Sequence, residues 1–259
     1  MTKRFYDLHV MPGKPDESAR LFRSLSLDGA CVVRAFDSEY KAFSDTIKDA
    51  GSKTGYPLFS GAFITAKNPE EVQKKARASL ECGADLVLID GGNEEINRAA
   101  SECWEVDVIC HPERAPGKDL LDQKNSGLDD VAARYMAERG IAIEICLAEL
   151  LSCYGVVRAQ VMGRMRQNIR LARKYETPII LTSGASDRCG MRAPQDMCSL
   201  GISLGMEIGM AKAAVSAFPE MLIKKAVDRR DPDILLAGLK VVSWGGTGPE
   251  KNKKMFGWY

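Results

Sequence analysis

Short apolar runs rich in β-branched residues alternate along this chain with longer segments in which apolar residues recur every three or four positions. The short runs predict buried β-strands, and the longer segments, such as 69–82 and 128–139, predict amphipathic helices. Seven runs predict strands, at residues 5–11, 29–36, 58–65, 85–90, 106–110, 141–147 and 178–183.

The alternation of strand and helix predicts parallel strands joined by right-handed crossovers. A doubly wound sheet satisfies the same order, but it rarely needs seven strands, and no Gly-x-Gly-x-x-Gly motif follows the first run. We therefore predict an α/β fold in the form of a TIM-like (β/α) barrel, for which 259 residues are sufficient. The barrel is expected to be irregular, because an eighth strand is signalled only by a short stretch around residues 204–206.

One barrel domain is predicted over residues 1–239, followed by a C-terminal extension over residues 240–259. In the extension, glycine, lysine and aromatic residues replace the periodic apolar pattern. The lysines and aromatic side chains of residues 251–259 could stack on nucleobases, hold a partner protein or form a frayed tail.

The charges of the chain nearly cancel, with 36 basic against 35 acidic side chains, so total charge gives no argument for nucleic-acid or membrane binding. Any basic site must therefore be local. The eight cysteines form no Cys-x-x-Cys pair, no apolar signal segment follows Met1, and no apolar run has the ~18 residues of a membrane span. We expect a cytoplasmic protein with reduced thiols and no membrane contact.

Polar residues lie on, at the end of or directly after several predicted strands, where a parallel barrel collects its functional groups. They are Asp7, His9, Asp90, His111, Glu144 and Ser183. Hydrogen-bonded polar residues inside or at the rim of the barrel are the interpretation that we favour. The alternative is a mononuclear metal site, although the chain has only two histidines; its ligands would be His9, Asp90, His111 and Glu144.

A turn rich in glycine and serine follows the last predicted strand, over residues 182–194. Its backbone N–H groups could hold a phosphate, with Arg188 and Arg192 supplying positive charge, as loops after the late strands of barrels often do. A plain turn leading into a helix that starts at Pro194 explains the same residues equally well.

The helix predicted over about residues 155–175 separates its apolar residues from its basic ones. The stripe expected to face the core consists of Val157, Val161, Met165, Ile169, Ala172 and Tyr175. The opposite side carries Arg166, Arg170, Arg173 and Lys174. No acidic residue precedes Glu176 in this helix, whereas solvated basic faces usually carry compensating glutamates. We therefore interpret this side as a surface for phosphate groups of a nucleic acid.

Four short motifs occur in an order that resembles the component 3 family of ribonuclease P proteins. They are FYDLHV at residues 5–10, TSGAS at 182–186, MRAP at 191–194, and LGM at 204–206 followed by KAAVSAFPEML. The resemblance extends from Phe5 to about Ala226. It implies an irregular TIM-like barrel related to the polymerase and histidinol phosphatase (PHP) phosphoesterases.

The first motif departs from the pattern of the PHP enzymes, which carry His-x-His on their first strand. Here the matching residues are His9-Val10-Met11. A thioether is a poor ligand for hard or borderline metal ions. The resemblance therefore implies a barrel with no catalytic residue, metal or cofactor of its own.

The resemblance further implies a subunit of ribonuclease P that helps the catalytic RNA to remove the 5′ leader from precursor tRNA, with the Mg²⁺ ions held by the RNA. The implied partners are ribonuclease P RNA, ribonuclease P protein component 2 in a heterodimer or heterotetramer, other ribonuclease P proteins and, indirectly, precursor tRNA. Positions that match the family's RNA contacts are His111, Arg114, Lys118, Lys124, Arg188 and Arg192, beside the helix residues Arg166, Arg170, Arg173 and Lys174.

Two other functions remain open. One is a PHP-type metal-dependent phosphoesterase that uses the four candidate ligands named above. The other is a protein-binding scaffold whose contact with RNA is incidental.

Overall fold

The computed structural model of the chain describes residues 3–11, 13, 15–114, 118–119, 124–236, 239–246 and 248. Seven parallel strands, each hydrogen-bonded to the next in chain order, form its centre. The strands are β1 (Tyr6–Val10), β2 (Gly29–Ala35), β3 (Leu58–Ile64), β4 (Leu86–Asp90), β5 (Val108–Cys110), β6 (Ala142–Cys146) and β7 (Ile179–Thr182).

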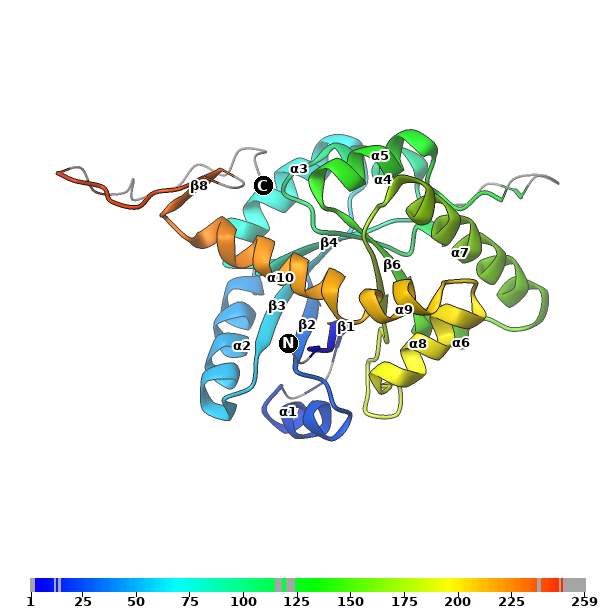
Figure 1. Ribbon diagram of the computed structural model, residues 1–259, viewed down its shortest axis with the longest axis horizontal. Coiled ribbons are helices and arrows are strands. Elements are labelled where there is room, and N and C mark those ends of the chain that lie inside the picture. The colour runs from blue at the N-terminus through cyan, green and yellow to red at the C-terminus, as the bar shows by residue number, and fades with distance from the viewer. Residues whose placement is uncertain are drawn as a thin grey trace.

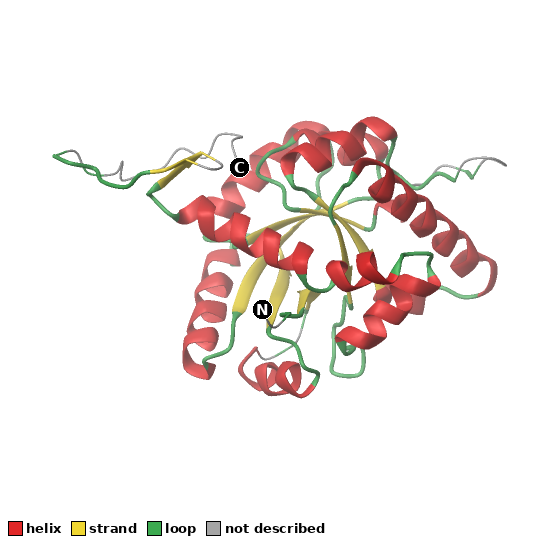
Figure 2. Ribbon diagram, viewed as in Figure 1, coloured by secondary structure: helices red, strands yellow, loops and turns green. Residues whose placement is uncertain are grey.

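Helices surround the strands on the outside of the barrel, as Figure 2 shows. They are α1 (Pro15–Ser24), α2 (Tyr40–Thr54), α3 (Pro69–Glu81), α4 (Glu94–Glu102), the 3-10 turn η1 (Pro112–Arg114), α5 (Asp130–Arg139), α6 (Leu147–Ser152), α7 (Gly155–Tyr175), α8 (Pro194–Ser203), α9 (Ile208–Ala214) and α10 (Ala217–Arg230). Within the described ranges, no helix combines the length and the apolar character needed to cross a membrane.

Side-chain caps fix where three of these helices begin. Asn68, Asn93 and Asp129 each precede a helix and accept hydrogen bonds from backbone N–H groups of its first turn. Such donors have no partner within the helix itself. The caps therefore set the points at which the chain turns from the carboxyl ends of the strands into α3, α4 and α5.

The barrel closes where the turn after β7 meets β1. The Gly184 N–H donates to the His9 carbonyl at 3.0 Å, and the Met11 N–H donates to the Ala185 carbonyl at 2.8 Å. An isolated parallel bridge joins Ala185 to β1. Gly184 has a φ of 61°, and a Cβ atom there would lie 2.3 Å from the Cys146 sulfur, so only glycine fits.

The interior of the barrel is packed with side chains and is closed at its amino end by α10. One cluster joins side chains from the strands to side chains of α10: Leu8, Val33, Leu88, Val108, Ile180, Leu222 and Ala226 are among its members. Helix α10 crosses the strands in Figure 1. Since α10 and apolar side chains fill this end, a site open to solvent is expected at the opposite, carboxyl end.

A buried ion network anchors α10 beneath the barrel. Asp107, directly before β5, lies 2.5 Å from Arg229 Nη2 and 3.2 Å from Lys225 Nζ, and accepts the Val87 N–H at 2.9 Å. Burial alone raises the pKa of Asp107, but the charges of Arg229 and Lys225 hold it below its ordinary value of 3.8. The stability from this carboxylate is thus present above pH 3.8 and is lost as the pH falls through the lowered pKa.

The predicted irregular barrel is confirmed, and each of the seven predicted runs contains one strand. The prediction of a weak eighth strand around residues 204–206 was wrong. These residues form the turn between α8 and α9, in which the N–H groups of Leu204 and Met206 donate to the Gly201 carbonyl at 3.2 and 3.0 Å. Bonded within this turn, the segment has no N–H groups left for the sheet.

Helix α7 has the predicted bounds, but its apolar stripe faces the core over only part of its length. Met165, Ile169 and Ala172 are buried, whereas Val157 is 54% exposed. The prediction for Val157 was wrong because the first turns of α7 lack a neighbouring layer; Val156 beside it is 75% exposed.

Beyond α10 the chain forms a small antiparallel hairpin of β8 (Ile234–Leu236) and β9 (Leu239–Lys240), which extends away from the barrel in Figure 1. The hairpin lies on both sides of the domain boundary predicted at residue 239, and that boundary stays a prediction. The lysines and aromatic residues of 251–259 lie outside the described residues.

Replacing Arg229 with methionine should lower the free energy of unfolding by about 3 kcal/mol, because Asp107 would lose its closest buried counter-charge. Urea denaturation followed by circular dichroism measures this change. Lys224→Ala, an exposed position on the same helix, is the control and should change stability by less than about 0.5 kcal/mol. Equal effects of the two substitutions would show that the network does not anchor α10.

Candidate functional site

The centre of the carboxyl end is a hydrogen-bonded ion pair between β1 and β6. His9 Nδ1 lies 2.7 Å from Glu144 Oε1, and the Thr182 hydroxyl donates to the same oxygen at 2.5 Å. His9 is 2% exposed and Glu144 is fully buried. The pair therefore spans the barrel interior, out of contact with water.

Each member of this pair stabilises the charge of the other. Burial lowers the pKa of His9, but the charge and the hydrogen bond of Glu144 outweigh burial and raise it above its ordinary value. Burial also raises the pKa of Glu144, yet the His9 imidazolium beside it holds that pKa well below its usual range. The pair therefore favours the charged form of both groups, and Nδ1 of His9 is already engaged by Glu144.

Asp7 ties the same strand to the turn after β7. The carboxylate of Asp7 accepts the Ser183 N–H at 3.2 Å and the His9 N–H at 3.2 Å. Burial raises the pKa of Asp7 to about 6 despite these hydrogen bonds. Asp7 thus serves barrel closure.

This closure bears on whether the turn at residues 182–194 holds a phosphate or is a plain turn, because it uses the N–H groups at the start of the turn. The N–H groups of Ser183, Gly184 and Ala185 donate to Asp7, to the His9 carbonyl and to the Ser183 hydroxyl, respectively. They are therefore occupied and cannot hold a phosphate. The phosphate interpretation was wrong for this part of the turn, which is a structural seam of the barrel.

The alternative metal site of the sequence, His9 with Asp90, His111 and Glu144, is not brought together as one set. Among the described residues, the groups with metal-ligand spacing are His9 with Cys110 and Glu144, His111 with Glu144 and Cys146, and His111 with Glu113 and Glu149. Asp90 belongs to none of them and instead lies 3.6 Å from Arg114 Nη1. Met11 is 43% exposed and lies outside the buried centre.

The two groups that contain cysteine have poor ligands. Burial raises the pKa values of Cys110 and Cys146 well above the ordinary thiol value, and the metal-binding form of cysteine is the thiolate. Glu144 is also engaged already by His9 and Thr182. These residues fit a packed barrel interior better than a catalytic metal centre with open coordination positions.

A second layer of charged groups lies between η1 and α6. Arg114 donates to both carboxylate oxygens of Glu149, through Nε at 2.8 Å and through Nη2. His111 Nδ1 is 3.8 Å from Glu149 Oε1, too far for a hydrogen bond. Glu113 is 1% exposed, and burial raises its pKa to about 8. Arg114 is therefore bound to Glu149, whereas the side chain of Glu113 and the Nδ1 of His111 have no hydrogen-bond partner.

The structure argues against an RNA contact for His111, because this residue is only 6% exposed. Its position directly after β5 turns the ring inward, next to the ring of His9 at a centroid distance of 5.8 Å. The sequence placed it correctly, directly after a strand, but gave no indication that its ring would be buried.

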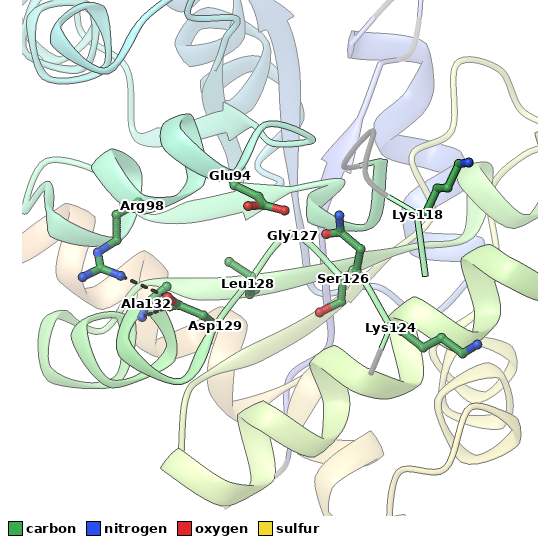
Figure 3. A pocket seen from close by; sticks show the side chains of 10 residues that line it. Glu94, Arg98, Lys118, Lys124, Ser126, Gly127, Leu128, Asp129 and Ala132 are labelled. Carbon is green, nitrogen blue, oxygen red and sulfur yellow. Dashed lines mark hydrogen bonds and ion pairs between the residues drawn. The ribbon is translucent and has the colours of Figure 1, made fainter. Parts of the chain in front are cut away.

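Lys118 and Lys124 belong to the long loop between η1 and α5, residues 115–129, and line a pocket of about 300 Å³. Figure 3 shows Arg98 paired with Asp129 on one side of this pocket and both lysine side chains extending from the other side. The returning loop is held in place at Gly127, whose carbonyl accepts from Asn97 Nδ2 at 2.8 Å. The two ammonium groups are thus presented from an anchored loop.

Helix α7 is connected to this loop by Arg164, a residue that sequence reasoning missed. Its guanidinium donates to Asp119 at 2.9 Å and to the Glu113 carbonyl at 2.9 Å. Such a contact between distant segments leaves no local signal in the sequence. It joins Asp119 of this loop and Glu113 of η1 to α7.

The basic side of α7 is exposed, as the sequence predicted, but it is partly compensated by other elements. Arg173 lies 3.8 Å from Glu207, which precedes α9, and Lys174 lies 3.2 Å from Asp130 of α5. Arg166 donates to the Ser203 carbonyl at 3.4 Å, and Arg170 is exposed. Since exposed ion pairs contribute little, these cations remain able to exchange their partners for phosphate.

The turn after β7 presents two further predicted residues. Arg188 is exposed, and Arg192 is half-buried with its Nη1 donating to the carbonyls of Cys189 and Met191 at 2.6 and 2.8 Å. Arg192 therefore braces the turn, and Arg188 is the more accessible of the two.

Fold and site together define an irregular TIM-like barrel whose polar centre is sealed and whose basic candidate residues lie on loops and on α7. A model of the family described as RNase P subunit p30 matches residues 4–231. The chain belongs to the RNase P subunit p30 family, and it is therefore a protein subunit of an endoribonuclease of tRNA processing.

Curated relatives agree over nearly the whole chain. Ribonuclease P protein component 3 of Methanosarcina acetivorans is 33% identical over 249 residues, covering 92% of this chain and 96% of that protein. The protein of the same name from Methanosarcina mazei is 31% identical over 248 residues, covering 92% and 95%.

Solved structures support the fold. A chain of archaeal ribonuclease P with mature tRNA aligns with a TM-score of 0.73 at 24% identity, covering 96% of this chain and 100% of that one. A Xaa-Pro dipeptidase aligns with a TM-score of 0.55 at 13% identity, covering 87% of this chain and 76% of that one. At these identities the likeness concerns the barrel alone.

Replacing His9 with alanine should lower the free energy of unfolding by about 3–5 kcal/mol, because Glu144 would be left buried without its counter-charge. In a Glu144→Gln background the same substitution should cost at least about 1 kcal/mol less, since no charge is then stranded. Chemical denaturation of the four proteins of this double-mutant cycle measures the coupling. Additive effects would contradict a stabilising ion pair at the barrel centre.

Proposed function

We propose that this chain acts within ribonuclease P as a subunit without a catalytic site of its own, which helps the catalytic RNA to remove the 5′ leader from precursor tRNA. It does so by binding ribonuclease P RNA and a second protein. The observation that carries the proposal is the contrast between a sealed polar centre and accessible cations on the outer surface.

The sealed centre supports a role without chemistry in the barrel. A hydrolytic site needs a base that can take a proton and a position that water and substrate can reach. His9 is hydrogen-bonded to Glu144, whose charge raises the pKa of His9, and both side chains are buried. The Mg²⁺ ions of the cleavage reaction are accordingly assigned to the RNA and not to this chain.

The basic side of α7 is the proposed main contact with RNA. Arg166, Arg170 and Arg173 lie on successive turns of one helix and are all exposed. Guanidinium groups in such a row can replace the counterions of consecutive phosphates, which gives salt-dependent affinity. Lys174 extends the row, although its pairing with Asp130 makes its contribution smaller.

Loops at the barrel mouth are the proposed second contact. Lys118 and Lys124 extend from the anchored loop, and Arg188 lies on the turn after β7. Arg114 and Arg192 are given supporting roles, because Arg114 is bound to Glu149 and Arg192 to backbone carbonyls. The precursor tRNA is then met only indirectly, through the RNA that these residues hold.

A protein partner is proposed for the exposed apolar residues where α6 leads into α7. Leu151, Tyr154, Val156 and Val157 are 47%, 76%, 75% and 54% exposed within one short segment. Exposed apolar side chains gathered in this way are typical of protein interfaces. We assign this segment to another ribonuclease P protein, with component 2 as the first candidate.

The compartment proposed for this function is the cytoplasm. All eight cysteines are free, which suits a reducing environment. Cys189 is exposed, so a disulfide-forming compartment would leave a reactive thiol on the surface.

Reversing Arg166, Arg170 and Arg173 to glutamate should weaken the binding of ribonuclease P RNA and lower the slope of log affinity against log salt by roughly one for each phosphate that the chain no longer neutralises. Filter binding or fluorescence anisotropy over a range of salt concentrations measures both quantities.

The matched control reverses Lys41, Lys48 and Lys53, three exposed lysines of α2, and changes the net charge by the same amount. This control should retain most of the affinity. If both triple variants bind equally well, or if both lose affinity equally, the RNA surface is not on α7.

A further inference from the structure

Glu113 is a buried carboxylate for which the structure provides no partner. It is 1% exposed, and neither of its side-chain oxygens has a hydrogen bond. Removing a carboxyl group from water without replacing its hydrogen bonds is costly in either protonation state. A residue in this position therefore points to a ligand that satisfies it.

Two other side chains place possible metal-ligand atoms close to the Glu113 carboxylate. Each of His111, Glu113 and Glu149 offers a ligand atom, and these atoms all lie within 4.8 Å of one another. His111 Nδ1 also lacks a hydrogen bond, at 3.8 Å from Glu149 Oε1. Two ligands that each lie about 2.1 Å from one ion are separated by up to about 4.2 Å, so the 3.8 Å spacing suits a shared cation.

The backbone holds His111 in this place against its own preference. His111 has a φ of 50°, in the left-handed region that a residue with a side chain rarely adopts. Such strain persists where the surrounding structure requires one side-chain position. Here the imidazole is buried beside the His9 ring, with its Nδ1 3.8 Å from Glu149.

Arg114 is arranged as the outer support of such a site. Its guanidinium holds both oxygens of Glu149, which orients the carboxylate while leaving further lone pairs for an ion. Carboxylates that bind metal ions are commonly held by a second hydrogen-bonding group in this way. Arg164 holds the backbone at the second carboxylate ligand, by donating to the Glu113 carbonyl at 2.9 Å.

We infer that His111, Glu113 and Glu149 form a structural site for one divalent first-row transition-metal ion such as Mn²⁺ or Zn²⁺. One imidazole nitrogen with two carboxylates suits these ions, whereas Mg²⁺ prefers oxygen alone. The site is structural because His111 and Glu113 are 6% and 1% exposed, which leaves no route for a substrate. The ion joins η1 to α6 and so fixes the start of the loop that carries Lys118 and Lys124.

The test counts metal ions bound to the full chain. The protein is stripped with chelator, kept reduced, and titrated with Mn²⁺ while free Mn²⁺ is followed by electron paramagnetic resonance; Zn²⁺ is titrated in parallel by equilibrium dialysis. We expect one equivalent that depends on Glu113, with affinity at least about tenfold weaker in Glu113→Gln. Glu138→Gln, an exposed position of α5, is the matched control and should bind like the unchanged chain.

Thermal melting separates the loss of a ligand from the loss of the fold. Without metal, Glu113→Gln should melt at or above the temperature of the unchanged chain, because the buried carboxylate is gone. With metal, the unchanged chain and Glu138→Gln should gain several degrees, and Glu113→Gln should gain none. The inference is overturned if neither ion binds, or if Glu113→Gln binds the same number of ions with the same affinity as the control.

Discussion

The buried pair of His9 and Glu144 is the constraint on which the rest of this structure depends. It joins β1 to β6 through the barrel interior, and the hydroxyl of Thr182 adds β7 to the same oxygen. A pair of charges so far from water is tolerable only when each charge satisfies the other. Because both charges are used in this way, the centre of the barrel holds the strands together and offers no free base. The charged side chains that solvent and partners can reach therefore lie on the loops and outer helices.

The architecture was readable from the sequence because it rests on local periodicity. The seven strand runs and the bounds of α7 follow from apolar spacing alone. What the sequence did not reveal depends on contacts between distant segments. Glu207 and Asp130 approach the basic side of α7 from other elements, and no pattern within the helix predicts them.

The candidate site shows the same division between local and distant signals. His9, Glu144 and His111 were found because they lie on or directly after strands, but the burial of His111 and the orphaned carboxylate of Glu113 are tertiary facts. The sequence did place Glu113 two residues after His111, close to the end of a predicted strand. A charged residue so close to a strand end is ordinary, however, and only its burial makes it unusual.

The central claim is that this barrel assists an RNA enzyme and does not cleave RNA itself. The most direct measurement is reconstitution, in which 5′-leader cleavage of precursor tRNA is followed with ribonuclease P RNA, protein component 2 and this chain, each present or omitted. The account predicts no cleavage by the chain alone with Mg²⁺ or Mn²⁺, and faster cleavage by RNA and component 2 when the chain is added. Cleavage by the chain without RNA, or a rate that its addition leaves unchanged, would contradict the account.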